Sequence, residues 1–281
     1  MNQTDKLKAD FLTWRSSRCS ALREDLLRRV TRRDSGTLRP ILGQSYKTMA
    51  GDTLKVETRI AYLSPATESG VNKCHASTPA CAAACLGHSS GQLVFATSKH
   101  ARICKAIWHT IDPIGFADRL DREISALVRR TSKDGTTPAV RVDGSSEIWA
   151  ETLKCSDGLR LVDKHPSVEF YDYGKANPKT RRRMARNQHL TFSVSDLPAS
   201  LQVAKSYLRN GGNAAIVLRT PEDVQAAIAT GIDGFPVIDG DLTDARFKDA
   251  PGHFVALYSK GAAKTDDTGF VWNVTQGVAH Q

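Results

Sequence analysis

The stretch CHASTPACAAACLGHSSG, residues 74–91, is the segment around which the rest of the chain is organised. It contains three of the six cysteines, with six residues between Cys74 and Cys81 and three between Cys81 and Cys85. Thiolates are the soft ligands that iron–sulfur clusters and zinc select, and a curled loop can bring three of them to one metal. Three cysteines leave one iron of a [4Fe–4S] cluster open, whereas a zinc site would need a fourth ligand. The stretch therefore predicts a metal site, with a cluster and zinc as alternatives.

A structural role for the same cysteines is equally compatible with the residues. Cysteine is among the most frequently buried residue types and packs as a small hydrophobe, so CAAAC also fits one helical turn in a core. The spacing matches no common local template for zinc or ferredoxin sites. Packing, a cluster and zinc all remain open on the residues alone.

The composition is that of an ordinary globular protein. The chain has 281 residues, of which 40% are hydrophobic and 25% charged, enough for one large or two small domains. No apolar run approaches about 18 residues, so no membrane span is expected. The first residues, MNQTDKLKADFLTWRSS, lack the apolar segment of a signal peptide. We expect a cytoplasmic protein, in which clustered cysteines bind metal or catalyse rather than form disulfides.

The charge of the chain favours polyanionic partners. The formal net charge is +9, and basic proteins are drawn to nucleic acids. One basic run, between residues 23 and 33, is typical of a solvated helix face. The second run, KTRRRMAR at residues 179–186, predicts phosphate contacts by Arg181, Arg182, Arg183 and Arg186.

The order of apolar segments indicates an α/β fold. Residues 1–34 carry apolar residues at helical spacing, and residues 35–52 are rich in glycine and proline. Seven short apolar segments without clean alternation follow, as expected for parallel strands that are covered on both faces. They lie at residues 56–63, 139–143, 168–171, 190–194, 214–218, 235–238 and 254–258.

We therefore predict a partial (β/α) barrel of six or seven mostly parallel strands. Its expected domains are an N-terminal helical extension (1–52), the α/β domain (53–261) and a C-terminal tail (262–281). The FADRLDREISALVRR segment, residues 116–130, is the clearest amphipathic helix, and Asp112 before Pro113 is a helix-start signal.

Polar residues follow most of the expected strands. Parallel strands deliver their carboxyl ends to one side, so these residues are expected to share one cavity with the cysteines. We predict ligand-binding roles for Arg141, Asp143, Glu147, Asp172, Lys175 and Ser193, and catalytic roles for Asp239, Asp241 and Lys260. Arg141 and Lys175 are the expected anion holders, and Asp239 the expected partner of a hydroxyl or amine. For Asp241, capping of a turn is the alternative.

Several common enzyme classes lack their motifs in this chain. It contains no GxGxxG, GxxxxGK[ST] or HExxH pattern. The letters GHSSG at residues 87–91 match GxSxG, but they lie inside the cysteine stretch and not directly after an expected strand, so they do not form the elbow of a serine hydrolase. Nicotinamide dehydrogenases, P-loop hydrolases and serine hydrolases are therefore not supported.

Segments spread over residues 55–261 resemble one known family. They include TPACAAACL, HARICKAIWHTIDPIGFADRLDREI, VRVDGSSEIWAE, FYDYGK, LTFSVS, FPVIDGDLTDARFKD and FVALYSKG. Together they resemble the phage gene product eighty-eight family. This resemblance implies a phage or prophage origin, and hence the cytoplasm of an infected bacterium, but brings no activity with it.

A more distant resemblance is to radical S-adenosylmethionine enzymes. These carry three cysteines in a loop after the first strand of a partial barrel, where a [4Fe–4S] cluster leaves one iron for S-adenosylmethionine. The likeness implies ligand roles for Cys74, Cys81 and Cys85. The superfamily usually has three and then two residues between its cysteines, and an aromatic residue before the last, where Ala84 stands here. These departures count against S-adenosylmethionine cleavage more than they count against cluster binding or the barrel fold.

Two functional hypotheses follow. The first is an iron–sulfur enzyme that acts on a nucleic acid or a host protein. The second is a non-enzymatic phage factor that binds nucleic acid, with structural or zinc-bound cysteines.

Overall fold

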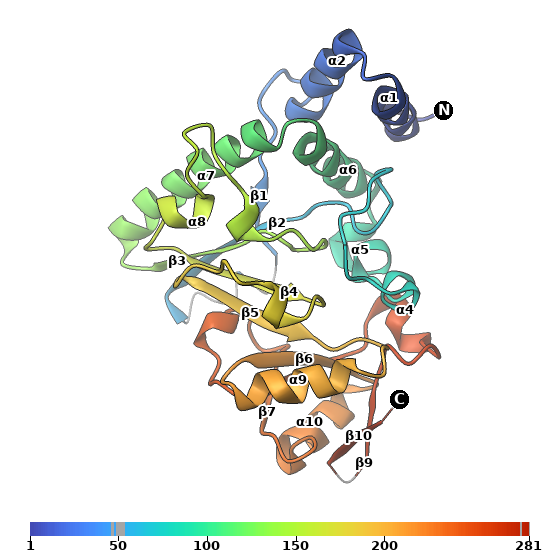
Figure 1. The fold of residues 1–281 in the computed structure, drawn as a ribbon, viewed down its shortest axis with the longest axis vertical. Helices are drawn as coiled ribbons and strands as arrows, with labels where there is room; N and C mark the ends of the chain where they lie inside the picture. Colours follow the sequence, from blue (N-terminus) through green and yellow to red (C-terminus); the bar gives the residue numbers. More distant parts are fainter. Residues whose placement is uncertain (46–47, 49–53, 276, 281) are drawn as a thin grey trace.

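An eight-stranded sheet forms the centre of the molecule (Figure 1). The computed structural model describes residues 1–45, 48, 54–275 and 277–280. The strand order is β1-β2-β3-β4-β5-β6-β8-β7, with β1 antiparallel and the other seven strands parallel. The strands are β1 (Leu42–Gly43), β2 (Val56–Ala61), β3 (Thr137–Arg141), β4 (Glu169–Gly174), β5 (Gln188–Ser193), β6 (Asn213–Leu218), β7 (Val237–Asp239) and β8 (Phe254–Tyr258). The predicted α/β class with a mostly parallel sheet is confirmed, whereas the predicted boundary at residues 52 and 53 lies outside the described residues.

The parallel strands are short and apolar because helices and loops cover them. In β6 (NAAIVL) only Val217 is not fully buried, which explains the lack of alternation in its sequence. Helix α9 (Ser200–Arg209) packs on β5 and β6, and α10 (Pro221–Thr230) packs on β7 and β8. No helix or strand was predicted for the α9 segment.

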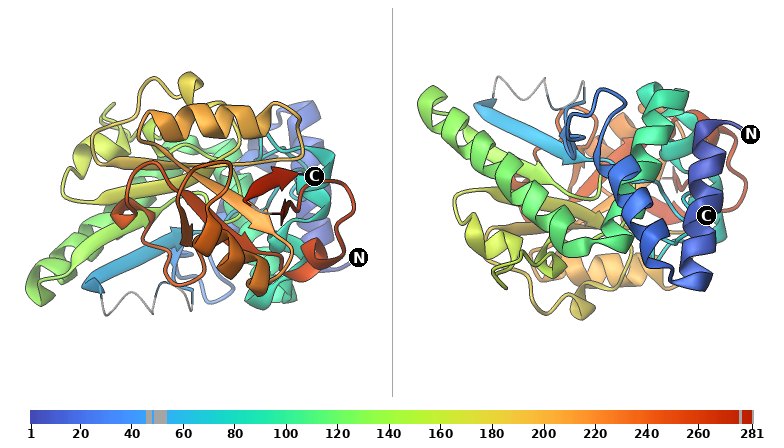
Figure 2. Two further views of the ribbon diagram at one scale, coloured as in Figure 1. Left: turned by 90° about the horizontal axis from the view of Figure 1, so that it is seen from below. Right: turned by 90° about the horizontal axis from the view of Figure 1, so that it is seen from above.

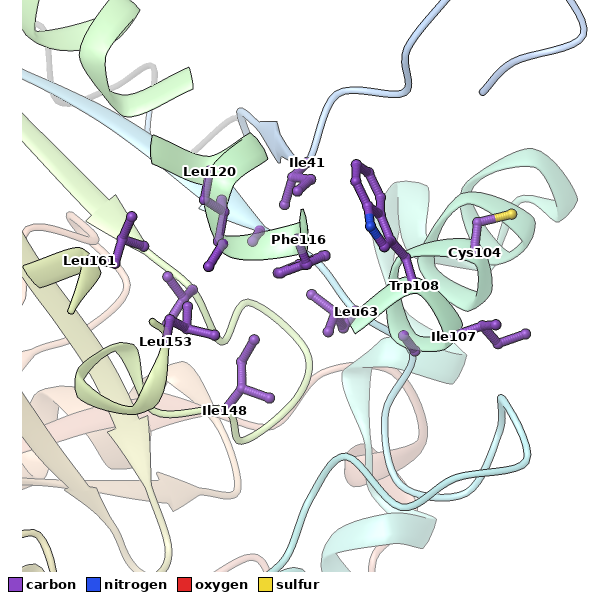
Figure 3. Packing of buried hydrophobic residues seen from close by; sticks show 14 of the residues in the cluster. Ile41, Leu63, Cys104, Ile107, Trp108, Phe116, Leu120, Ile148, Leu153 and Leu161 are labelled. Carbon is purple, nitrogen blue, oxygen red and sulfur yellow. The ribbon is translucent and has the colours of Figure 1, made fainter. Parts of the chain in front are cut away.

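Two long helices connect β2 to β3. The Asp112 carboxylate accepts the Gly115 backbone N–H at 3.1 Å, which ends α6 (Ala96–Ile111) and starts α7 (Pro113–Asp134). Gly135, with φ of 65°, closes α7 in the left-handed conformation that glycine adopts without strain. The buried face of α7 packs on β3, and Figure 3 shows Phe116 and Leu120 meeting Ile41 and Leu63.

The N-terminal helices lie outside α6 rather than on the sheet. Helices α1 (Gln3–Ser17) and α2 (Ser20–Thr31) both contact α6 (Figures 1 and 2). Their buried residues Phe11 and Leu26 belong to the same hydrophobic cluster as Trp108. The helical structure predicted for residues 1–34 thus consists of two helices. They add one layer to the main hydrophobic core.

The remaining elements are short. They are helices α4 (Pro79–Ala83), α5 (Leu86–Ser89) and α8 (Leu161–Lys164), 3-10 helices at 91–94, 150–152, 178–180, 246–248 and 261–265, and the hairpin of β9 (Asn273–Thr275) and β10 (Val278–His280). None of the described helices is both long enough and apolar enough to cross a membrane.

The C-terminal segment returns to the cysteine stretch. Ala263 and Val271 share a buried cluster with Ala84, and the Ala262 backbone N–H donates to the Ser89 hydroxyl at 3.1 Å. Trp272 is buried and its backbone N–H donates to the Val217 carbonyl. The segment expected to be a tail therefore covers the cysteine loop.

A buried lysine on α6 gives a testable pH dependence of stability. Burial lowers the pKa of Lys105 to about 8, although its ammonium donates to the Ile41 carbonyl at 2.9 Å. Because the unfolded chain holds this proton up to a pKa of about 10.4, the unfolded state binds more protons between pH 8 and 10. The free energy of unfolding should therefore gain up to about 3 kcal/mol from this group as the pH rises through that window.

The Lys105→Met variant should lose this rise in the free energy of unfolding with pH. The Lys99→Met variant, which changes a half-exposed side chain of the same helix, should retain the rise. Urea denaturation at several pH values between 7 and 10 measures the effect. Parallel stability profiles for the wild type and Lys105→Met would contradict the assignment.

Candidate functional site

A cavity of about 420 Å³ lies at the carboxyl ends of the parallel strands. The cysteine loop after β2 forms one wall, and the segments that follow β3, β4, β7 and β8 form the others. Of the residues predicted for a site, ten line the cavity: Cys74, Cys81, Cys85, Arg141, Asp143, Glu147, Lys175, Ser193, Asp241 and Lys260. Parallel topology explains this gathering, because each of these segments leaves its strand on the same side of the sheet.

The cysteine loop is held in place by a helix cap. The Thr78 side-chain oxygen accepts the Cys81 backbone N–H at 3.0 Å, and Pro79 takes the first position of α4. The Thr78 hydroxyl also donates to the Asp196 carboxylate, which follows β5. The cap therefore fixes Cys81 relative to the sheet.

Polar groups act on the cysteine sulfurs. The Ala66 backbone N–H donates to Cys74 Sγ at 3.2 Å, the Gly87 backbone opposes the effect of burial on the pKa of Cys85, and Cys81 contributes to the raised pKa of Lys175. A donor such as the Ala66 N–H favours the thiolate form that a metal binds.

Two of the thiols, Cys74 and Cys85, resist ionisation without a metal. Burial and, to a smaller extent, the neighbouring sulfurs raise the pKa of Cys74 to about 11. Burial also raises the pKa of Cys85. A metal would have to displace these protons. Within the part of the chain that the structure describes, no three Cys, His, Asp or Glu side chains stand close enough to hold a metal ion as placed.

The donor set nevertheless fits a thiolate metal centre. Three thiols share one cavity, the Ala66 N–H donates to Cys74 Sγ, and Ala84 and Gly87 keep the adjoining wall small. Thiolates are the ligands of iron–sulfur clusters and of many zinc sites.

Glu147 connects the cysteine loop to the end of β4. Its carboxylate accepts backbone N–H groups of Ala76 at 3.0 Å, Lys175 at 2.9 Å and Ala176 at 3.1 Å. These hydrogen bonds use both carboxylate oxygens. Glu147, which was predicted to bind a ligand, therefore joins two walls of the cavity.

Arg141 lies at the opposite end of the cavity between two carboxylates. Its Nε donates to Asp143 Oδ1 at 2.9 Å, and its Nη1 is 3.6 Å from Asp244 Oδ1. Its guanidinium also stacks over the Tyr173 ring, with 4.5 Å from Cζ to the centroid. The positive charge of Arg141 is therefore shared between two carboxylates. Arg141 should attract an external anion less strongly than its predicted role as an anion holder requires.

The pKa of Asp143 differs from that of an ordinary aspartate. Burial raises its pKa to about 7, against the opposing attraction of Arg141. A raised carboxyl pKa is one property that a general acid or base needs.

Lys175 and Lys260 are the other two cations of the cavity. The Lys175 ammonium lies 3.5 Å from the Ser193 hydroxyl. Its pKa is lowered by burial but raised overall, because Cys81 and Glu147 outweigh that effect. Lys260 is paired with Asp241 at 2.5 Å. Of these two lysines, Lys175 is therefore the one that interacts with the cavity thiols.

Two predicted acids lie elsewhere. Asp239 accepts the Asp241 backbone N–H at 2.8 Å, and its other oxygen faces Gln225 on α10, so it stabilises a turn and does not line the cavity. Asp172 is buried against Arg181. Both expectations of a cavity-facing role are corrected, because turn and ion-pair contacts engage these carboxylates.

Arg181 is not the phosphate-binding residue that the basic run predicted. Its side chain is buried and donates to Glu151 at 2.7 and 2.6 Å and to Asp172 at 2.7 and 2.9 Å. Arg182, Arg183 and Arg186 of the same run are exposed. Burial and pairing remove Arg181 from any surface that a nucleic acid reaches.

Several cavity residues had no predicted role. Asp244 and Ser146 are among the polar residues that follow the strands, as their neighbours with predicted roles are, and for Asp244 capping was the alternative. The Ser146 hydroxyl is buried and has no hydrogen-bond partner among the described residues. Phe270 comes from the presumed tail, and no local pattern points to it.

Comparison with known proteins gives one match. The model of a family described as gene product 88 matches residues 32–274. No curated protein and no solved structure matches the chain significantly.

Proposed function

We propose that this chain, which belongs to the gene product 88 family of phage proteins, is a phage-encoded iron–sulfur enzyme related in design to radical S-adenosylmethionine enzymes. In this proposal Cys74, Cys81 and Cys85 hold a [4Fe–4S] cluster. Its open iron faces the cavity, where S-adenosylmethionine is the candidate ligand. The substrate is a nucleic acid or another host macromolecule.

One observation carries the proposal: three thiols line a single cavity at the carboxyl end of the first parallel strand, and the Lys175 side chain lines the same cavity. The Ala66 backbone N–H donates to Cys74 Sγ at 3.2 Å, and such a donor favours the thiolate form that a metal binds. Cys155 provides the comparison within this chain, since it is buried inside the main hydrophobic cluster, where a thiol packs as a hydrophobe.

The curvature of the sheet supports the partial barrel of this proposal. Asp244, which follows β7 at one edge of the sheet, accepts the Tyr171 hydroxyl of β4 at 2.8 Å. Lys248, in the same connection, donates to the Leu54 carbonyl just before β2 at 3.0 Å. A flat sheet of this order would separate β7 from β2 by the width of five intervening strands.

In this proposal the cluster, Lys175 and Asp143 have different chemical roles. A bound cluster supplies one-electron transfer and an open coordination position. Lys175 provides positive charge for a ligand carboxylate or phosphate beside the thiols. Asp143, with its pKa near 7, holds or releases a proton at the far end.

A nucleic acid is the substrate class that the surface favours. Lys179, Arg182, Arg183 and Arg186 are exposed on the connection between β4 and β5, which begins at the cavity with Lys175. Exposed arginines bind phosphates bidentately, and their contribution falls with salt.

Metal analysis of the anaerobically purified protein tests the proposal. We expect about four irons and four sulfides per chain, with the broad visible absorbance of a cluster, after reconstitution. Stoichiometric zinc in a colourless protein, or protein that takes up neither metal, would instead support the non-enzymatic nucleic-acid-binding factor. Electron paramagnetic resonance of the reduced protein, with and without S-adenosylmethionine, then tests whether the open iron binds that ligand.

A further inference from the structure

Arg102 is a buried arginine that lies behind the cavity wall formed by the cysteine loop. It lies on α6 and is 2% exposed. Its Nη2 donates to the Leu93 carbonyl at 2.9 Å, whereas Nε and Nη1 have no hydrogen-bond partner among the described residues. Buried guanidinium groups normally use their donors, so two unused ones require an explanation.

The nearest acid does not provide that explanation. Glu68 Oε2 is 4.0 Å from Arg102 Nη1, which is beyond hydrogen-bond distance. The Glu68 carboxylate already accepts the Ser64 hydroxyl at 2.6 Å and lies 3.3 Å from the Lys99 ammonium. Glu68 therefore leaves the positive charge of Arg102 only partly compensated.

One of the unused donors, Nη1, lies near a cysteine sulfur. An added Cβ at Gly87 would meet Arg102 Nη1 at 3.2 Å and Cys85 Sγ at 3.3 Å, so the guanidinium and the sulfur approach the same point of the backbone. Gly87 and Cys85 both line the cavity. The absence of a side chain at residue 87 is what keeps this space open.

We propose that Arg102 is a positioning residue whose guanidinium compensates the negative charge of the metal-bound Cys85 thiolate and directs its unused Nη1–H group toward it. The inference rests on the proposed metal centre at Cys74, Cys81 and Cys85. Outer partners of this kind orient metal ligands and adjust the affinity and the reduction potential of the metal.

The test uses the full-length protein and two probes. The first is Co²⁺, whose thiolate charge-transfer bands report binding to the cysteines, and the second is the reconstituted cluster, whose midpoint potential is titrated. We expect Arg102→Met to weaken Co²⁺ binding by about 10- to 100-fold. It should also lower the midpoint potential of the cluster, because loss of a positive charge disfavours the more negative reduced form.

Two further variants identify the cause. Arg102→Lys keeps the charge but loses the planar donors, and should fall between the wild type and Arg102→Met. Lys99→Met removes a positive charge from the same helix and the same Glu68, but at a half-exposed side chain, and should leave both readouts unchanged. A purely structural role for Arg102 would instead lower the unfolding temperature with no change in cobalt affinity or potential.

The outcomes separate this inference from the proposed function. If the wild type binds metal and both Arg102 variants match it in affinity and potential, the role of Arg102 is refuted and the metal site stands. If the wild type binds neither cobalt nor a cluster, the metal site itself is refuted and the role of Arg102 with it. Should Arg102→Met fail to fold, Arg102→Lys alone decides, since wild-type affinity and potential in that variant would overturn the inference.

Discussion

Replacement of any one of Cys74, Cys81 and Cys85 with alanine is expected to abolish stable binding of the cluster. Three thiolates are the complete protein ligand set in the proposed site, so each loss leaves a second iron without a protein ligand. Structural metal centres contribute about 10–16 kcal/mol of binding free energy in the well-measured zinc cases, which indicates how large the effect of a lost ligand can be. Iron and sulfide content after identical anaerobic reconstitution measures the result.

The chain contains its own controls for this experiment. Cys155→Ala and Cys104→Ala remove buried thiols of the main hydrophobic cluster, and Cys19→Ala removes an exposed one. All three should retain wild-type iron. Equal iron loss in Cys155→Ala, or full iron in Cys81→Ala, would show that the thiols of the cavity are not the ligands. If the wild type bound zinc instead, the same variants would decide which cysteines hold it.

Replacement of Arg181 with methionine is expected to give the largest loss of stability among single substitutions in the basic run. The change leaves the Glu151 and Asp172 carboxylates buried without their cation, and breaking a buried ion pair in this way costs about 3–5 kcal/mol. Arg182→Met, at the exposed neighbouring position, should change the free energy of unfolding by less than about 0.5 kcal/mol. Urea denaturation at pH 7 compares the two variants.

The pH dependence of this loss has a definite sign. The pKa of Glu151 is lowered in the folded protein, where the hydrogen bonds and charge of Arg181 outweigh the opposing effect of burial. Burial already raises the pKa of Asp172 although Arg181 opposes it. Without Arg181, the effect of burial on Glu151 is opposed mainly by the Gln188 amide, so both carboxyls should prefer to be protonated in the folded state. The folded variant therefore binds more protons than its unfolded chain, so the stability lost at pH 7 should shrink as the pH falls toward 4. A loss that grows on acidification would contradict the buried pair.

The Arg181 pair also changes how the basic run is interpreted. Sequence composition groups four arginines as equivalent phosphate contacts, whereas the fold separates Arg181 from Arg182, Arg183 and Arg186 by burial. A neutralising substitution at Arg181 would weaken nucleic-acid binding only by unfolding the protein. Experiments on the polyanion hypothesis should therefore use the three exposed positions.

Local sequence patterns determined much of the fold. The short apolar runs, covered on both faces, specify parallel strands, because a strand with one wet face would alternate. The Asp112–Pro113 pair and Gly135 specify where α7 begins and ends, since caps act through residues three or four positions away. The gathering of Cys81, Arg141 and Lys175 at one cavity also follows from the chain order, because consecutive parallel strands present their carboxyl ends on one side.

Only the tertiary structure decided which of these polar residues are free to act. Arg181 meets Glu151 across thirty positions of sequence, and Asp244 reaches Tyr171 across the sheet. Arg102 is buried beside Cys85 although its helix reads as an ordinary charged one. Periodicity and capping are short-range signals, whereas pairing of buried charges depends on which segments the curvature of the sheet and the β8-β7 strand order bring together. The sequence by itself therefore determined the elements and the end of the sheet where the cavity forms, and long-range packing decided the partners of each charge.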